Sequence, residues 1–200
     1  MVSFTVASFA AMAATLFVTE LTDKDSLLLI AVSTRVPPRV TFMAGAAAFL
    51  ITTTVIVTLG SLLITVVPVV WVRLAGGVVM LAYGLWQARG AVGQKAVEEQ
   101  ESRLARAGTT WKLFVSLVLA LAVLDLAGDA TEILTLVFVS EYGNILFVFS
   151  GVCTGLLAAT AVEATLGSRL GKLFTPRRLQ VGSAIIFLLL GASIVLFSAV

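Results

Sequence analysis

The chain lacks several residue types on which many active sites depend. None of its 200 residues is a histidine, which excludes Ser-His-Asp triads, histidine zinc sites and histidine proton shuttles. Cys153 is the only cysteine, which excludes an intrachain disulfide, a CxxC redox pair and a thiolate metal cluster. Any metal ion must therefore be held by oxygen ligands, which suits hard cations such as Ca²⁺ or Mn²⁺.

Charged residues are also scarce. They make up only 12% of the chain, whereas 60% of its residues are hydrophobic and the mean hydropathy is +1.10. Soluble domains carry about a quarter charged residues to cover their surface, so the solvent of this chain is lipid. Basic and aromatic residues do not interleave as in proteins that bind single strands, so we expect no nucleic-acid partner. The N-terminal segment lacks a basic region, and we expect a retained membrane helix there, with no cleaved signal peptide.

Long apolar runs predict six transmembrane helices, because a bilayer crossing needs about 20 mostly apolar residues. The only hydrophilic stretch longer than a turn separates these runs into two groups of three. We therefore expect an all-α integral membrane fold with one three-helix repeat over 1–89, a cytoplasmic linker over 90–110 and a second repeat over 111–200. The predicted spans cover 2–32, 41–66, 69–87, 113–139, 145–170 and 181–200.

The basic residues predict an orientation, because Lys and Arg gather on the cytoplasmic side of membrane proteins. Eleven of the thirteen fall in or beside the first, third and fifth connections, and the exceptions are Lys24 and Arg73. Both termini are therefore expected outside. The eleven residues are Arg35, Arg39, Arg89, Lys95, Arg103, Arg106, Lys112, Arg169, Lys172, Arg177 and Arg178.

The two halves resemble each other. Asp129 follows Asp23 by 106 residues, and TLGSRL at 165–170 follows TLGSLL at 58–63 by 107 residues. With three spans in each half, the second unit must enter the membrane in the opposite sense to the first. Inverted repeats with interrupted, charged helices at matching positions indicate a transport site where the repeats meet. A duplication without functional symmetry is the simpler alternative.

Two stretches place ionisable residues inside the apolar runs, TELTDKDS at 19–26 and DLAGDATE at 125–132. A charge within a membrane segment is costly and points to a functional site. In a continuous helix, the three acids of the second stretch would share one stripe, at i, i+4 and i+7. So many carboxylates on one narrow face require a metal ion, protons or a basic partner.

Lys24 is the only basic residue in these stretches, so an internal salt-bridge network cannot satisfy six carboxylates. Asp25 would point inward only if its helix were kinked or unwound. A further acid, Glu163, lies deep in the fifth span, where the second span has Ile56. We therefore expect Glu20, Asp23, Asp125, Asp129, Thr131 and Glu132 as metal ligands, with Lys24, Asp25 and Glu163 as proton or charge partners.

These motifs resemble those of uncharacterised protein family 0016, the Golgi-type calcium/manganese transporters and bacterial manganese exporters of the lysine-exporter superfamily. Its members carry E-x-G-D-K-[TS] in the first helix of each of two three-helix repeats. ELTDKD at 20–25 keeps the glutamate, aspartate and lysine, with Thr22 at the glycine position and Asp25 at the hydroxyl position. AGDAT at 127–131 keeps the glycine, aspartate and threonine, whereas Leu126 and Ala130 replace the glutamate and lysine. Asp125 and Glu132 can restore the charge that the second copy has lost.

The resemblance implies a secondary transporter that exports Mn²⁺ or Ca²⁺ in exchange for protons, with one midplane cation site built from the first and fourth spans. The resemblance implies no enzymatic activity and no resident cofactor. The expected location is a prokaryotic cell membrane, where the chain can also form a homo-oligomer. Another substrate of the superfamily, Cd²⁺ or an amino acid, remains an alternative. So do a channel-like or non-transporting subunit and an intramembrane aspartyl protease, although LAGD at 126–129 lacks the first glycine of the GxGD signature.

Overall fold

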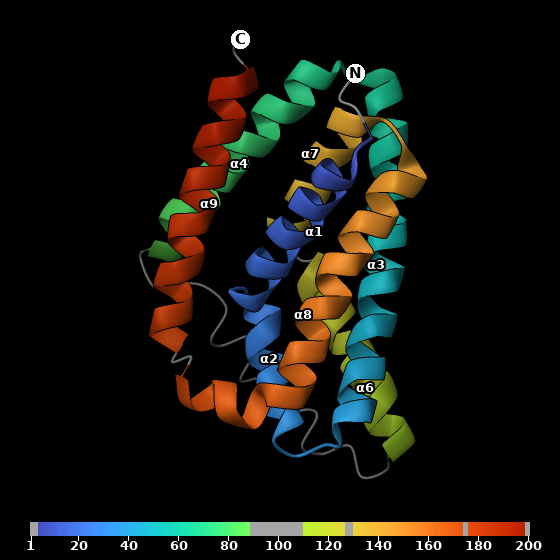
Figure 1. Ribbon diagram of the computed structural model, residues 1–200, viewed down its shortest axis with the longest axis vertical. Helices are drawn as coiled ribbons and strands as arrows, with labels where there is room; N and C mark the ends of the chain where they lie inside the picture. The colour runs from blue at the N-terminus through green and yellow to red at the C-terminus, as the bar shows by residue number, and fades with distance from the viewer. Residues whose placement is uncertain (1–3, 89–109, 127–129, 174–175, 199–200) are drawn as a thin grey trace.

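The computed structural model describes residues 4–88, 110–126, 130–173 and 176–198, and these residues are helical apart from short turns (Figure 1). The predicted linker at 90–110 therefore lies outside the described residues except for its last residue. The first half contains α1 (Val6–Leu21), α2 (Lys24–Ser33), α3 (Pro38–Val66) and α4 (Val69–Ala88). The second half contains α6 (Thr110–Leu126), α7 (Ala130–Tyr142), α8 (Ile145–Leu173) and α9 (Pro176–Ser198).

Residues with special backbone preferences separate the long helices. Pro38 occupies the first turn of α3, where its missing amide hydrogen costs nothing. Pro68 separates α3 from α4, and the amide of Val67 still donates to the carbonyl of Leu63. Gly143, at φ 64°, makes the turn between α7 and α8 in a conformation that favours glycine.

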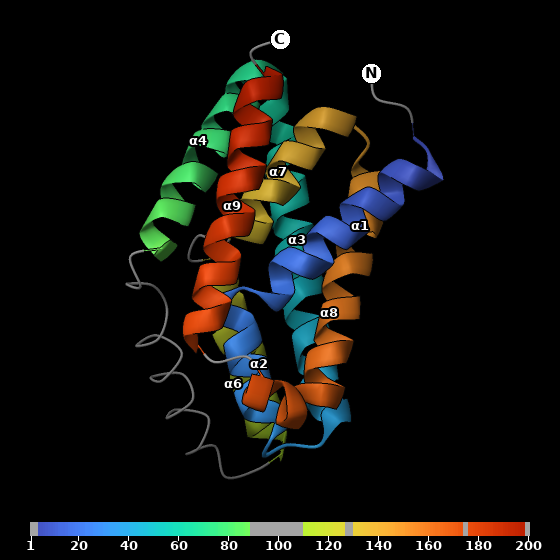
Figure 2. The same ribbon diagram turned by 60° about the vertical axis from the view of Figure 1, so that its left-hand side comes forward.

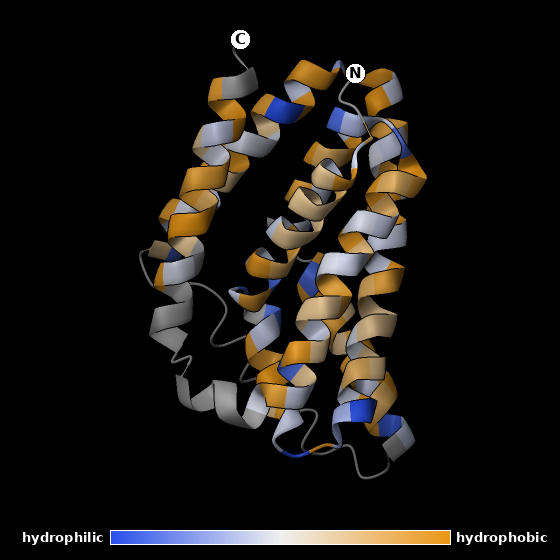
Figure 3. Cartoon of the chain, viewed as in Figure 1, coloured by the Kyte–Doolittle hydropathy of each residue, from blue (hydrophilic) through white to orange (hydrophobic). Residues whose placement is uncertain are grey.

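The helices are long and apolar enough for a membrane protein. By length and composition α3, α4 and Ile145–Gly167 of α8 can each cross a bilayer alone. Two bent helix pairs are long and apolar enough to form one further span each: Val6–Leu21 bends by 68° relative to Asp25–Ser33, and Trp111–Leu126 bends by 63° relative to Thr131–Tyr142. The sixth predicted span falls on α9, whose described apolar part, Ala184–Leu196, is shorter. Figure 3 shows hydrophobic residues along most of the described helices.

The two halves pack as counterparts. The third helices, α4 and α9, form the most extensive pair, and the second helices, α3 and α8, pack on each other at the other side of the bundle (Figure 1). The broken helix of each half packs on the long second helix of the other half: α1 and α2 on α8, and α6 and α7 on α3. This exchange of partners is the arrangement expected of two intertwined repeats.

Close contacts at glycines show that α4 and α9 cross at an approximate twofold axis. A Cβ on Gly84 would lie 3.2 Å from the Ala184 carbonyl oxygen, and a Cβ on Gly191 would lie 2.9 Å from the Gly77 carbonyl oxygen. A shift of 107 residues converts Gly84 into Gly191 and Gly77 into Ala184. The two close approaches are therefore the same contact made twice, as an internal twofold axis requires. Small residues allow such backbone contact between membrane helices.

Candidate functional site

The first charged stretch contains the break between α1 and α2. The helix α1 ends at Leu21, and Thr22 is its C-cap. The Thr22 hydroxyl donates to the Thr19 carbonyl oxygen at 2.9 Å, and the Asp23 amide donates to the Glu20 carbonyl oxygen at 3.0 Å. These local bonds satisfy carbonyls that the last turn of a helix otherwise leaves without a partner.

The acids at this break are buried. Glu20 and Asp25 are 0% exposed, and Asp23 is 1% exposed. The helix is bent by 68° at this break, and such a kink is what an inward-facing Asp25 required. Each of these three residues interacts with other groups of the protein. Burial of three acids within one short segment is costly unless positive charge or hydrogen-bond donors compensate it. More buried acids lie at this break than anywhere else in the described residues.

The second charged stretch also lies at a break, but its helices are not continuous. Asp125 is in the last turn of α6, whereas Thr131 and Glu132 are in the first turn of α7. The prediction that Asp125 and Glu132 share one straight stripe is therefore wrong, because the i, i+7 spacing assumed a continuous helix and the two helices are bent by 63°. Asp125 is 3% exposed and Thr131 is 2% exposed, whereas Glu132 is half-buried. Asp129 lies outside the described residues.

The two breaks lie at the same level of the bundle. The upper half of each broken span packs on the other, α1 on α7, and so do the lower halves, α2 and α6 (Figures 1 and 2). The C-terminal ends of α1 and α6 therefore both lie in the middle of the molecule. The partial negative charge of helix C-termini favours cations, as in transporters with discontinuous helices.

Sequence reasoning missed Ser26, which is 0% exposed at the start of α2. The hydroxyl of Ser26 is the side-chain group that approaches the carboxyl of Glu163 on α8, although the two do not reach hydrogen-bonding geometry. Glu163 is also 0% exposed, so its side chain is enclosed by the neighbouring helices. The signal that could have identified Ser26 was its place directly after Asp25, which occupies the hydroxyl position of the motif.

A metal cluster is not formed by the described side chains alone. Within the described ranges, no three acidic residues are grouped so that they could hold a metal ion. Asp129 and the side chain of Lys24, both predicted for the site, lie outside what the structure describes. The six-ligand assignment therefore stays a prediction, with Glu20 and Asp23 placed at one break and Asp125, Thr131 and Glu132 beside the other.

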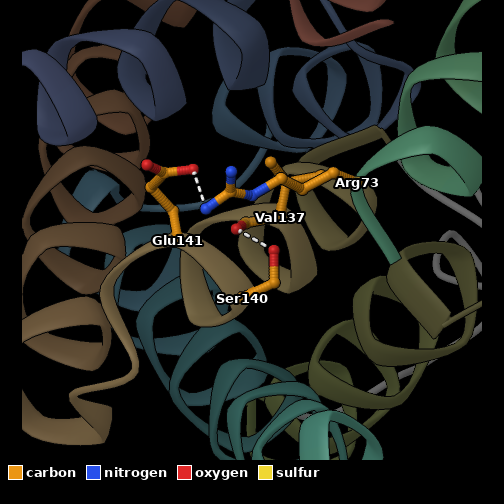
Figure 4. Close-up of polar contacts among 4 residues, drawn as sticks. All are labelled: Arg73, Val137, Ser140 and Glu141. Carbon is orange, nitrogen blue, oxygen red and sulfur yellow. Dashed lines mark hydrogen bonds and ion pairs between the residues drawn. The ribbon is translucent and has the colours of Figure 1, made fainter. Parts of the chain in front are cut away.

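Arg73, an exception to the predicted charge distribution, is neutralised by an ion pair. Its guanidinium lies 2.7 Å from the Glu141 carboxylate and links the start of α4 to the end of α7 (Figure 4). In the same turn the Ser140 hydroxyl donates to the Val137 carbonyl oxygen at 2.7 Å. The pair lies at the end of the bundle where α1 begins and α9 ends (Figure 1). It is remote from both breaks, so we do not include it in the site.

A cavity of about 400 Å³ between α3, α4 and α7 lacks side-chain groups that could bind a cation. Apolar side chains and Gly76 line it, and no charged residue takes part. Its lining includes Leu63, Val67, Trp71, Ile133, Leu136 and Val137.

The comparison with known families agrees with this geometry. The model of the family described as divalent cation/proton antiporter GDT1 matches residues 8–95 and 108–199, one segment in each half of the chain. No curated protein and no solved structure matches the chain. The family match selects a transporter over a protease, and a divalent cation and protons over an amino acid as substrates. Since the matched residues cover most of the chain, this membrane protein belongs to the GDT1 family of divalent cation/proton antiporters.

Proposed function

We propose that the protein exports Mn²⁺ or Ca²⁺ from a prokaryotic cytoplasm while protons enter, and that the two helix breaks form one cation site. The observation that carries this proposal is the burial of Glu20, Asp23 and Asp25 at the α1–α2 break. The α6–α7 break lies at the same level, with Asp125 buried beside it. Buried carboxylates from two repeats, next to two helix C-termini, provide the negative field and the oxygen ligands that a hard divalent cation needs.

In this proposal the first half supplies Glu20 and Asp23, and the second half supplies the remaining ligands. A cation from the cytoplasm binds the ionised carboxylates at the breaks. Protons from the outer side then compete for these oxygens and release the cation outward, and loss of the protons to the cytoplasm restores the site. The ligands of the second half would be Asp125, Asp129, Thr131 and Glu132.

The proposed orientation places both termini outside, with repeats over 1–89 and 111–200 joined by a cytoplasmic linker over 90–110. The distribution of basic residues supports it. Arg35 and Arg39 are at the connection from α2 to α3, and Lys112 is at the start of α6, at the end of the bundle opposite to the start of α4, which carries Arg73 (Figure 1). The test is labelling of single cysteines in a Cys153→Ser background with a membrane-impermeant maleimide in intact cells. A cysteine at Asn144 should react from outside and one at Thr34 should not; the reverse pattern would contradict the orientation.

Transport is tested in proteoliposomes that contain the full chain and a pH gradient. We expect saturable Mn²⁺ or Ca²⁺ uptake that depends on the gradient and is lost in Asp23→Asn and Asp129→Asn. Cd²⁺ is added as a competitor, because a preference for it would change the proposed cargo. A linear leak without saturation would point to a channel, and unchanged uptake in both variants would contradict the proposed site.

A further inference from the structure

Glu163 is the only acid in the described spans that lies outside both broken helices. It is fully buried, and neither of its carboxylate oxygens has a hydrogen-bond partner among the described residues. The nearby Ser26 hydroxyl does not reach hydrogen-bonding geometry. An ionised carboxylate is costly in such surroundings, so the neutral acid is the form that this position accepts unless positive charge arrives.

The position of Glu163 on α8 brings it beside the first break. The helix α8 runs along the whole of the first broken span (Figure 1). Above Glu163, Gly155 approaches Leu16 of α1, and below it, Gly167 meets Ser33 of α2. Glu163 therefore lies between these two contacts, at the height where α1 gives way to α2, and within the same interior as the acids of the motif.

The charges on the segments packed against α8 are mostly negative at this level. The described cations of these segments are Arg35, which follows the end of α2 at Ser33, and Arg39, in the first turn of α3. Lys24 begins α2, and its side chain lies outside the described part of the chain. The described carboxylates of α1, α2, α7 and the break are Glu20, Asp23, Asp25, Glu132 and Glu141, and the last of these is paired with Arg73 at the end of α7.

The acid is present in one repeat only. The residue of α3 that corresponds to Glu163 is Ile56, so the twofold relation of the helices does not extend to this carboxyl group. Glu163 also lies outside the two charged stretches that supply the proposed ligands, so a task separate from cation binding is open to it.

We propose that Glu163 carries a proton of the exchange, separately from the acids that hold the cation. This inference rests on the proposed function, because it requires a cation that enters and leaves the adjacent breaks. The arriving cation supplies the positive charge that stabilises the ionised carboxylate, and Glu163 releases one proton to water on the cytoplasmic side. When the cation leaves outward, the carboxylate loses that compensation and takes one proton from the outer side.

The test separates proton coupling from cation binding in the full chain in proteoliposomes. Exchange of labelled for unlabelled Mn²⁺ at equal pH moves no net proton, whereas uptake driven by a pH gradient does. In Glu163→Gln we expect Mn²⁺ binding and Mn²⁺/Mn²⁺ exchange within about threefold of the unmodified protein, and gradient-driven uptake reduced about tenfold or more. Glutamine keeps the size and hydrogen-bonding capacity of the side chain, so a merely structural role would leave all three quantities unchanged.

Two results would overturn the inference: unchanged gradient-driven uptake in Glu163→Gln, or loss of Mn²⁺ binding together with uptake, which would make Glu163 a cation ligand. Size-exclusion chromatography shows whether Glu163→Gln folds. If it does not, Glu163→Asp replaces it and should retain gradient-driven Mn²⁺ uptake, with the pH dependence of that uptake shifted. An unshifted pH dependence would overturn the inference. Asp23→Asn is the comparison variant and should lose binding and both modes of exchange. Absence of both modes in the unmodified protein would instead overturn the proposed function.

Discussion

Gly77 of α4 and Gly191 of α9 face each other where the third helices of the two repeats cross. A Cβ on Gly191 would lie 2.9 Å from the carbonyl oxygen of Gly77 and 2.9 Å from the amide nitrogen of Leu81. Both of these atoms belong to backbone, which cannot move aside as a flexible side chain can. The crossing therefore requires glycine at position 191, and it fixes how closely the two repeats approach.

Gly191→Ala should lower the stability of the protein by about 1–3 kcal/mol, because the added methyl group forces α4 and α9 apart. Gly182, on the same helix, is the matched control, since nothing lies within 4 Å of its Cβ position. Gly182→Ala should change stability by no more than about 1 kcal/mol and in the favourable direction. Thermal unfolding in detergent measures both variants, and equal effects would contradict the described crossing.

Asp23→Asn should abolish pH-driven cation uptake, because it removes charge from the most deeply buried acidic segment while it preserves side-chain size. Glu141→Gln is the control, since Glu141 is part of an ion pair far from the breaks and about 30% of its side chain is exposed. Uptake should stay within about twofold in that control, because pairs this exposed contribute little. Equal losses in both variants would show that any lost carboxylate impairs transport and would remove the support for a local site.

Asp125→Asn and Glu132→Gln should differ in their effects, because the two acids differ in burial. Asp125 is 3% exposed, and we expect its loss to weaken Mn²⁺ binding about tenfold or more. Glu132 is half-buried, and its loss should preserve transport but change the ratio of Mn²⁺ to Ca²⁺ uptake about threefold, since Ca²⁺ accepts more oxygen ligands. Competition between the two ions in proteoliposomes gives this ratio. Identical behaviour of the two variants would argue against unequal roles.

The ion pair between Arg73 and Glu141 should contribute at most about 1 kcal/mol, because its side chains are 28% and 30% exposed. A double-mutant cycle with Arg73→Gln and Glu141→Gln measures the coupling in thermal unfolding. The coupling should decrease further when the salt concentration is raised. A coupling well above 2 kcal/mol would mean that the pair is more shielded from solvent than its exposure indicates.

Much of the fold could be predicted from hydropathy alone, since α3, α4 and α8 coincide closely with the long apolar runs. The breaks were marked by charges, because a segment with several acids cannot remain an ordinary lipid-embedded helix. The stripe through Asp125 and Glu132 was wrong for a physical reason. Side-chain periodicity has meaning only within a continuous helix, and the spacing of acids does not reveal where a helix ends.

The partners of buried groups could not be predicted from the sequence. Nothing local to Glu163 indicates that Ser26 lies beside it, because α8 and α2 come together only through the tertiary fold. Likewise, the glycines of α4 and α9 indicate close packing in general, but the pairing of Gly77 with Gly191 depends on how the two repeats cross. The repeat itself was visible in sequence, whereas the contacts that it makes in space were not.

Anomalous scattering from crystals grown with Mn²⁺ tests the single-site hypothesis most directly. If the breaks at Asp23 and Asp129 form one site, one strong anomalous peak should lie between them, surrounded by carboxylate oxygens at about 2.1–2.3 Å. The peak should vanish in crystals of Asp23→Asn grown under the same conditions. A peak elsewhere in the bundle, or a peak that persists in that variant, would contradict a shared cation site at the two breaks.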